Sequence, residues 1–194
     1  MKALKSIFKI LGLIVIGIVM AIIISFSIVA YQTSRQKIAY QDEIKKYSEK
    51  YNMDPLLIAS IIKVESDYDN GAHSNQNAKG LMQLDYNLNL GVGYFNYLYK
   101  YYNNVDLALA AYNGGIGNVD KWINEKKIDK HDPDPTKIPV EETRQYVIKI
   151  NSNYDLMKVF YEDGLPSENE LKNRRELSIK NYKKFVKKIL FDVF

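Results

Sequence analysis

The chain of 194 residues contains no cysteine and only two histidines. The lack of cysteine excludes disulfide bonds, a thiolate nucleophile and cysteine-ligated metals. His73 and His131 stand far apart in polar segments, and neither belongs to a spaced ligand motif such as H-E-x-x-H. We therefore expect no metal ion and no cofactor. The formal net charge of +4 is too small to suggest nucleic acid as a partner.

The sequence also lacks internal repeats, low-complexity tracts and any sustained alternation of apolar and polar residues. Apolar residues make up 46% of the chain, so the chain is not of the disordered class. Its apolar residues recur at helical spacing instead, and one helix has a clear start, with Asp54 as N-cap and Pro55 at the first helical position. Three glycines, Gly114, Gly115 and Gly117, allow a tight turn with positive φ. The sequence predicts an all-α fold.

A long uncharged run lies near the N-terminus. Residues Ile10 to Tyr31 carry no charge over 22 positions, close to the roughly 20 that span a bilayer as a helix. Lysines before the run slightly favour a cytoplasmic N-terminus, which would place the remaining chain outside the cytoplasm. A cleaved signal peptide is the rival interpretation. Its only plausible cleavage site follows Ala30, with bulky Ile28 where a small residue is preferred, so we favour a retained single-pass anchor in the cell membrane.

We divide the chain into four parts on these patterns. A cytoplasmic tip and transmembrane anchor occupy residues 1–31, a linker 32–39, a helical domain 40–153, and a basic helical extension 154–194. Within the extension, Leu171 to Leu190 hold eight basic residues and one acidic residue, interleaved with apolar ones. Such a helix could lie on an anionic membrane surface, pack on the domain with a solvated lysine face, or contact anionic wall polymers.

Glu65 is the first candidate for catalysis. It stands at the end of the apolar stretch "IIKVES", and it falls on the same helical face as Ile58, Ile61 and Ile62. The pattern therefore predicts that the carboxylate continues a buried stripe. A carboxyl group withdrawn from water holds its proton more tightly, which suits a general acid. The ordinary alternative is a helix-end glutamate paired with a lysine.

Two further motifs combine small residues with polar ones. "AKGLMQL" places Gln83, which can both donate and accept hydrogen bonds, after a glycine that allows close approach of the backbone. "ALAAYNGGIGNV" places Tyr112 and Asn113 at the end of an alanine-rich helix, where they project as the chain breaks. Either motif alone fits an ordinary core helix.

In this order, five motifs together resemble the soluble lytic transglycosylase (SLT) domain, which is related to goose-type lysozyme. They are "IIKVES", "KGLMQL", "NLNLGVGYFNYL", "ALAAYNGGIGNV" and "IPVEETRQYV", and they cover about Tyr40 to Asn153. The resemblance implies a lysozyme-like all-α domain with Glu65 as the catalytic acid and base. It also implies that substrate-binding positions in the sugar cleft are held by Ser66, Met82, Gln83, Tyr112, Asn113, Glu142 and Tyr146.

The resemblance implies cleavage of the β-1,4 bond between N-acetylmuramic acid and N-acetylglucosamine in peptidoglycan glycan strands. Glu65 would protonate the linking oxygen and then accept the C6 hydroxyl proton, which closes a 1,6-anhydro ring without water. A lysozyme-type muramidase stays open, because Asp67, Asp69 or Asp85 could activate water. A wall-binding or assembly protein with a reduced cleft also stays open.

Two departures from the family pattern concern the cleft. Only three residues separate Gln83 from Asn87, where the family has a longer stretch, so part of one cleft wall is expected to be missing. Gly114 stands where alanine is more usual, and we expect it to loosen the turn.

Overall fold

The computed structural model describes residues 2–35, 38–66, 77–161 and 164–192. For residues 2–4, 66, 77–84 and 192, it describes the backbone alone. The chain forms two compact units, a small unit of residues 1–36 with 168–194 and a large unit of residues 37–167. Helices and turns account for the secondary structure of all the described residues, which confirms the predicted all-α fold.

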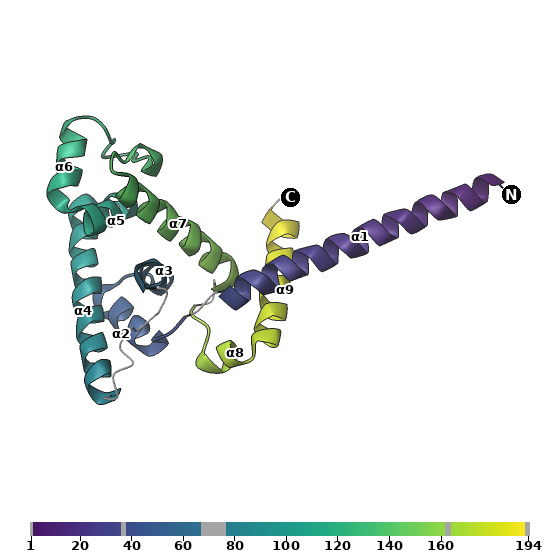
Figure 1. Ribbon diagram of the computed structural model, residues 1–194, viewed down its shortest axis with the longest axis horizontal. Helices are drawn as coiled ribbons and strands as arrows, with labels where there is room; N and C mark the ends of the chain where they lie inside the picture. The colour runs from purple at the N-terminus through teal and green to yellow at the C-terminus, as the bar shows by residue number, and fades with distance from the viewer. Residues whose placement is uncertain (1, 36–37, 67–76, 162–163, 193–194) are drawn as a thin grey trace. The chain divides into compact units, whose positions relative to one another are not determined.

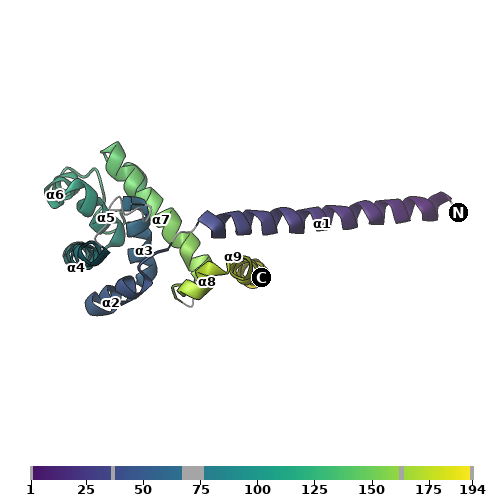
Figure 2. The ribbon, with the colours of Figure 1, turned by 60° about the horizontal axis from the view of Figure 1, so that its bottom comes forward.

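The large unit is a group of packed helices (Figures 1 and 2), in which the short helix of residues 105–114 is buried. Its elements are α2 (Gln41–Tyr51), α3 (Pro55–Ser66), α4 (Asn77–Tyr102), α5 (Val105–Gly114), α6 (Ile116–Asn124), the 3-10 turn η1 (Pro135–Lys137) and α7 (Glu141–Tyr161). Helix α5 contacts α4, α6 and α7, while α3 packs on α7 and α2. This arrangement brings α3, α4, α5 and α7 together, and these are the helices that carry the predicted motifs.

The buried core centres on α5. Its residues Leu107 to Ala111 are each no more than 1% exposed. The small alanine side chains let neighbouring helices approach α5 closely, and Asn104 caps its N-terminus by accepting a hydrogen bond from the Leu107 amide at 3.0 Å. Helix α3 begins as predicted, since the Asp54 carboxylate accepts a hydrogen bond from the Leu56 amide at 2.7 Å.

Helix α4 carries two of the predicted motifs. It begins at Asn77 and continues unbroken to Tyr102. The motif "KGLMQL" and the "N-x-x-x-G" segment, which is Asn87 to Gly91 of "NLNLGVGYFNYL", therefore share one helix here. Because Asn87 follows Gln83 so closely, the chain leaves no residues for a turn between them.

The glycines after α5 have separate roles. Gly115 alone of the three has a positive φ, at 86°, and it ends α5 and starts α6. Gly114 is the last residue of α5, and the looser turn that we expected there stays a prediction. A Cβ on Gly114 would lie 2.9 Å from Oγ1 of Thr143 on α7, so glycine is what allows α5 and α7 to touch. Gly117 faces open space.

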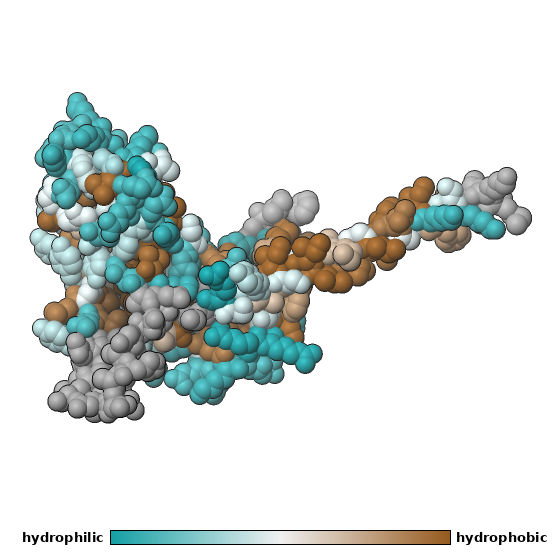
Figure 3. Space-filling view, in the orientation of Figure 1, coloured by the Kyte–Doolittle hydropathy of each residue, from teal (hydrophilic) through white to brown (hydrophobic). Residues whose placement is uncertain are grey.

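The small unit consists of α1 (Lys2–Arg35), α8 (Glu168–Lys172) and α9 (Arg174–Asp192). Between Lys5 and Arg35, α1 is long and apolar enough to cross a membrane, and its most apolar stretch has a mean hydropathy of 3.0. Figure 3 shows the apolar surface along this helix. A signal sequence near the N-terminus shares these properties.

One face of α9 packs on the C-terminal part of α1. The buried Asn181 amide donates to Oγ1 of the buried Thr33 at 3.1 Å. The Tyr182 and Ser25 hydroxyls are 2.9 Å apart, and the Tyr182 ring meets Phe26 edge-on at 5.3 Å. The extension helix therefore has a partner within its own unit, and that partner is α1.

Replacing Gly114 with alanine tests the close contact of α5 and α7. The added methyl group would press on Thr143, which is 2% exposed and β-branched, so it has little freedom to move. We expect Gly114→Ala to lower the free energy of unfolding by about 1–3 kcal/mol in denaturant titrations. Gly117→Ala is the matched control on α6, and it should be neutral or stabilise by about 0.5–1 kcal/mol, because it removes a helical glycine without a clash. Equal stability of the two variants would contradict the packing argument.

Candidate active site

The large unit contains a pocket of about 420 Å³. Its lining residues come from α3, α4, α5 and the residue before α2, and they are Tyr40, Ile58, Ile61, Ile62, Glu65, Asn87, Leu88, Gly91, Val92, Phe95 and Tyr112. The isoleucine stripe that sequence analysis placed beside Glu65 is thus one wall of this pocket. Glu65 is the one carboxylate among the described lining residues.

Glu65 is positioned by the end of its helix. Helix α3 ends at Ser66, one residue beyond Glu65, and Glu65 is exposed. The predicted burial of this side chain is therefore wrong, although its alignment with the apolar stripe is confirmed. The hydroxyl of Tyr146, on α7, donates a hydrogen bond to Oε1 of Glu65 at 2.6 Å. This contact fixes the direction of the carboxylate at the pocket wall.

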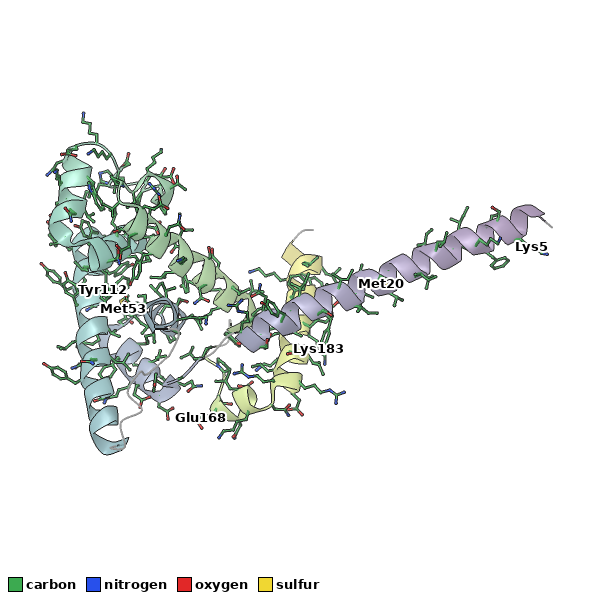
Figure 4. The ribbon with its side chains drawn as sticks, in the orientation of Figure 1. Lys5, Met20, Met53, Tyr112, Glu168 and Lys183 are labelled. Atoms are coloured by element: carbon green, nitrogen blue, oxygen red, sulfur yellow. The ribbon has the colours of Figure 1, made fainter. Side chains whose placement is uncertain are left out.

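Two tyrosines flank the acid, and both stay protonated at neutral pH. Burial, and next the hydrogen bond to Glu65, raise the pKa of Tyr146 well above its ordinary value of 10.0. Burial, and next the charge of Glu65, raise the pKa of Tyr112. Each phenol therefore remains a neutral hydrogen-bond donor beside the carboxylate. Tyr112, labelled in Figure 4, also packs against the rings of Tyr94 and Phe95 on α4.

Gly91 makes room for the Tyr112 hydroxyl. A Cβ at position 91 would lie 3.0 Å from that oxygen, so any side chain there would push on the phenol. Tyr40 closes another part of the pocket with a φ of 64°, an uncommon conformation for a residue other than glycine. The pocket lining includes Tyr40, Asn87 and Gly91, which the sequence motifs did not predict as site residues. The glycine in the "N-x-x-x-G" segment was the available signal for Gly91, whereas nothing local marks Tyr40.

The remaining predicted site residues fall into two groups. Asn113 is exposed beside Tyr112 and Glu142 is exposed in the first turn of α7, and neither belongs to the described pocket lining. The side chains of Ser66, Met82 and Gln83 lie outside the described part of the chain, so their predicted roles stay predictions. Residues 67–76, with Asp67, Asp69 and His73, lie outside it as well.

Asp85 is not a second carboxylate of the pocket. It faces α2, where Lys46 donates a hydrogen bond to its Oδ1 at 2.9 Å. Hydrogen bonding from Tyr47, and next from Lys46, lowers the pKa of Asp85. Asp85 is therefore excluded from the described pocket lining and ties α4 to α2 instead.

A family model described as the transglycosylase SLT domain matches residues 42–87 and 85–134. The chain carries an SLT domain. The two matched segments meet at residues 85–87, which is where the sequence lacks the longer family stretch.

Known relatives agree with this assignment. The soluble lytic murein transglycosylase of Salmonella typhimurium is 30% identical over 142 residues, which cover 58% of this chain and 22% of the relative. The membrane-bound lytic murein transglycosylase C of Serratia proteamaculans is 26% identical over 160 residues, which cover 58% of this chain and 45% of the relative. The chain thus spans less than half the length of these relatives. No solved structure matches the chain significantly.

Replacing Tyr146 with phenylalanine tests the contact with Glu65. Phenylalanine keeps the aromatic ring but cannot donate the hydrogen bond to Glu65. A hydrogen bond to a charged group contributes about 1.5–3 kcal/mol. We expect the kcat for peptidoglycan cleavage to fall roughly 10- to 100-fold, with KM unchanged. The matched control is Tyr154→Phe on the same helix, which removes a 2.5 Å hydrogen bond to Asp54, and neither residue belongs to the described pocket lining. A Tyr146→Phe enzyme as fast as the Tyr154→Phe enzyme would show that the contact does not position the acid.

Proposed function

We propose that this protein is a membrane-anchored lytic transglycosylase that cleaves peptidoglycan glycan strands. The observation that carries the proposal is Glu65, placed by Tyr146 at the wall of a pocket in an SLT domain. The names of the relatives support the same activity. A pocket of about 420 Å³ is also of the size that small-molecule sites have.

The reaction would begin with proton transfer. Glu65 protonates the oxygen that links N-acetylmuramic acid to N-acetylglucosamine, and the bond from C1 to that oxygen breaks. The substrate's own acetamido oxygen stabilises the positive charge left on C1, as in substrate-assisted glycosidases. Tyr146 holds Glu65 in place during this step and stabilises the carboxylate that proton transfer leaves behind.

The second step would use the same carboxylate as a base. Glu65 accepts the proton of the C6 hydroxyl, and O6 attacks C1 to close a 1,6-anhydro ring. No water enters, and Glu65 ends in its starting protonation state. A single carboxylate is sufficient for both steps, which fits a described lining with one carboxylate. Hydrolysis by a lysozyme-type muramidase would need a second group to activate water.

Product analysis separates the candidate functions. Mass spectrometry of fragments from purified peptidoglycan should show 1,6-anhydro ends. Reducing ends would identify a muramidase. A failure to release fragments, with retained binding to peptidoglycan, would identify a wall-binding protein with a reduced cleft.

Replacing Glu65 with glutamine tests the catalytic acid. Glutamine keeps the shape of the side chain and removes its titrating proton, so we expect cleavage to fall at least about 10²–10⁴-fold. Because Glu65 is exposed, the unfolding transition should stay where it is in the native protein. Glu49→Gln, an exposed glutamate on α2, should leave both activity and stability unchanged. Near-native cleavage by the Glu65→Gln variant would end the proposal that Glu65 is the acid.

The anchor forms a separate part of the proposal. Helix α1 has the length and apolar composition of a membrane span, and its side chains are exposed over the apolar stretch. With a cytoplasmic N-terminus, the SLT domain lies outside the cytoplasm, where peptidoglycan is.

Cell fractionation tests the anchor and its orientation. The full-length protein should remain in the membrane fraction after a high-salt wash, because an apolar span is not released by screening charge. External protease should digest its SLT domain in cells stripped of their wall. A soluble form that begins near Tyr31 would instead identify a cleaved signal peptide, and a domain protected from protease would reverse the orientation.

A further inference from the structure

Helix α9 crosses α1 and does not run along it. Asn181 and Tyr182 are neighbours on α9, yet Asn181 contacts Thr33 while Tyr182 contacts Ser25 and Phe26. Thr33 and Ser25 are separated by two turns of α1, or about 12 Å along its axis. The two sides of α9 therefore face opposite ends of α1. Figures 1 and 2 agree with this crossing.

The side of α9 that faces the N-terminal end of α1 is apolar. Counting from Tyr182 at helical spacing, the same side carries Ile179, Val186 and Ile189. We call these four residues the α9 stripe. Ile179 is 39% exposed and Ile189 is 47% exposed, so the stripe extends beyond its contact with α1. The side points along α1 toward the uncharged run of that helix, because Tyr182 reaches Ser25 within the run.

The opposite side of α9 carries three lysines, together with the buried Leu177 and, at the end of the helix, Phe191. Lys184 and Lys188 follow Asn181 at helical spacing, and Lys187 lies next to them on the outer surface. Asn181 marks the side that faces Thr33, near the C-terminal end of α1. The α9 stripe thus faces the N-terminal end of α1, and the lysine side of α9 faces the C-terminal end of α1.

We propose that α9 lies in the plane of the membrane interface, with the α9 stripe against the acyl chains and the lysine side against anionic lipid headgroups. This rests on the proposed span by α1. Because neighbouring residues of α9 contact positions two turns apart on α1, α9 crosses the span steeply and would run near the plane of the membrane surface, with its apolar side toward the membrane interior. Lysines at that depth reach headgroups through their long side chains, and anionic lipids supply the complementary charge.

Spin labels on single cysteines can measure the depth of each side, because the full chain has no cysteine of its own. Ile189→Cys reports the α9 stripe and Lys187→Cys the basic side, and both positions are exposed, so a label disturbs no packing. Val15→Cys reports the centre of α1. The full chain is reconstituted in vesicles of phosphatidylcholine with phosphatidylglycerol, and in vesicles of phosphatidylcholine alone. Collision with oxygen and with a water-soluble nickel chelate gives the depth.

In the anionic vesicles, the label at position 189 should lie among acyl chains and the label at position 187 among headgroups or in water. Replacing Lys184, Lys187 and Lys188 with glutamine should move the label at position 189 outward, to the depth found in neutral vesicles. Water at both positions would overturn the proposal. Dipolar broadening between labels would overturn it in favour of a second copy of the chain. A label at position 15 that is in water would show that the anchor itself fails, whereas a buried one leaves the anchor intact.

A second inference rests on the exposed tyrosines of α4. Tyr94, Tyr97 and Tyr101 lie along one face of the helix and are 45–55% exposed. Their ring centroids are 6.3 and 6.5 Å apart in succession, and Tyr94 contacts Tyr112 at the pocket at 5.7 Å. A continuous row of rings therefore leads from the pocket along α4.

We infer that this tyrosine row is an extended binding surface for the sugar units beyond the cleaved bond. The inference rests on the proposed function. One face of a pyranose ring presents C–H groups, which pack well on the electron-rich face of an aromatic ring. The row follows α4 from the pocket toward the C-terminal end of that helix, so a strand bound along it would leave the pocket in that direction.

Kinetics on long and short glycans test the tyrosine row. With long glycan strands freed of their peptides, Tyr97→Ala should raise KM about 3- to 10-fold, the size of one aromatic contact. Tyr97→Phe keeps the ring and should restore native KM, and a tetrasaccharide should show no difference among the three enzymes. An unchanged KM for Tyr97→Ala on long strands would overturn the inference that the tyrosine row binds sugar units. Binding of long strands by the Glu65→Gln variant tests the tyrosine row even if no cleavage occurs. Failure of the tyrosine row can therefore be told apart from failure of the proposed function.

Discussion

Close packing around α5 is the constraint on which the site depends. Five successive residues of this helix, from Leu107 to Ala111, are almost completely withdrawn from solvent. The three alanines among them, together with Gly91 on α4 and Gly114 on α5, let neighbouring helices approach α5 closely. That approach places Tyr112 and Tyr146 beside Glu65, although the three residues come from different helices. A bulkier residue at Gly91 would push on the Tyr112 hydroxyl, and one at Gly114 would push α5 away from α7.

The acid is controlled by its neighbours more than by burial. Glu65 is exposed, with the buried phenol of Tyr146 and the half-buried phenol of Tyr112 beside it. Because burial raises the pKa of both phenols, neither brings charge to the carboxylate, and Tyr146 donates a hydrogen bond to it. A lysine in place of Tyr146 would pair with Glu65 and favour its ionised form throughout, which hinders donation of a proton. A neutral donor orients the carboxylate while it leaves both protonation states usable in the proposed reaction.

Polar pairs fix the way in which α1 and α9 meet. The buried pair of Asn181 and Thr33 sits in a contact that is otherwise largely apolar, and the hydroxyls of Tyr182 and Ser25 add a second point. Sliding one helix along the other would leave buried polar groups without partners, at a cost of about 1–3 kcal/mol each. These contacts therefore hold α1 and α9 in one arrangement. That arrangement decides which side of α9 faces each end of α1.

The sequence by itself determined the helical class, the long apolar run, the start of α3 at Asp54 and Pro55, and Glu65 on the isoleucine stripe, because each depends on residues close together in the chain. The five motifs also indicated the SLT domain. Only the tertiary structure decided that Glu65 is exposed, that Gly114 serves a helix contact, that Tyr40 lines the pocket and that α9 pairs with α1. Each of these depends on residues far apart in sequence, whose distance is set by packing and leaves no periodic signal in the chain.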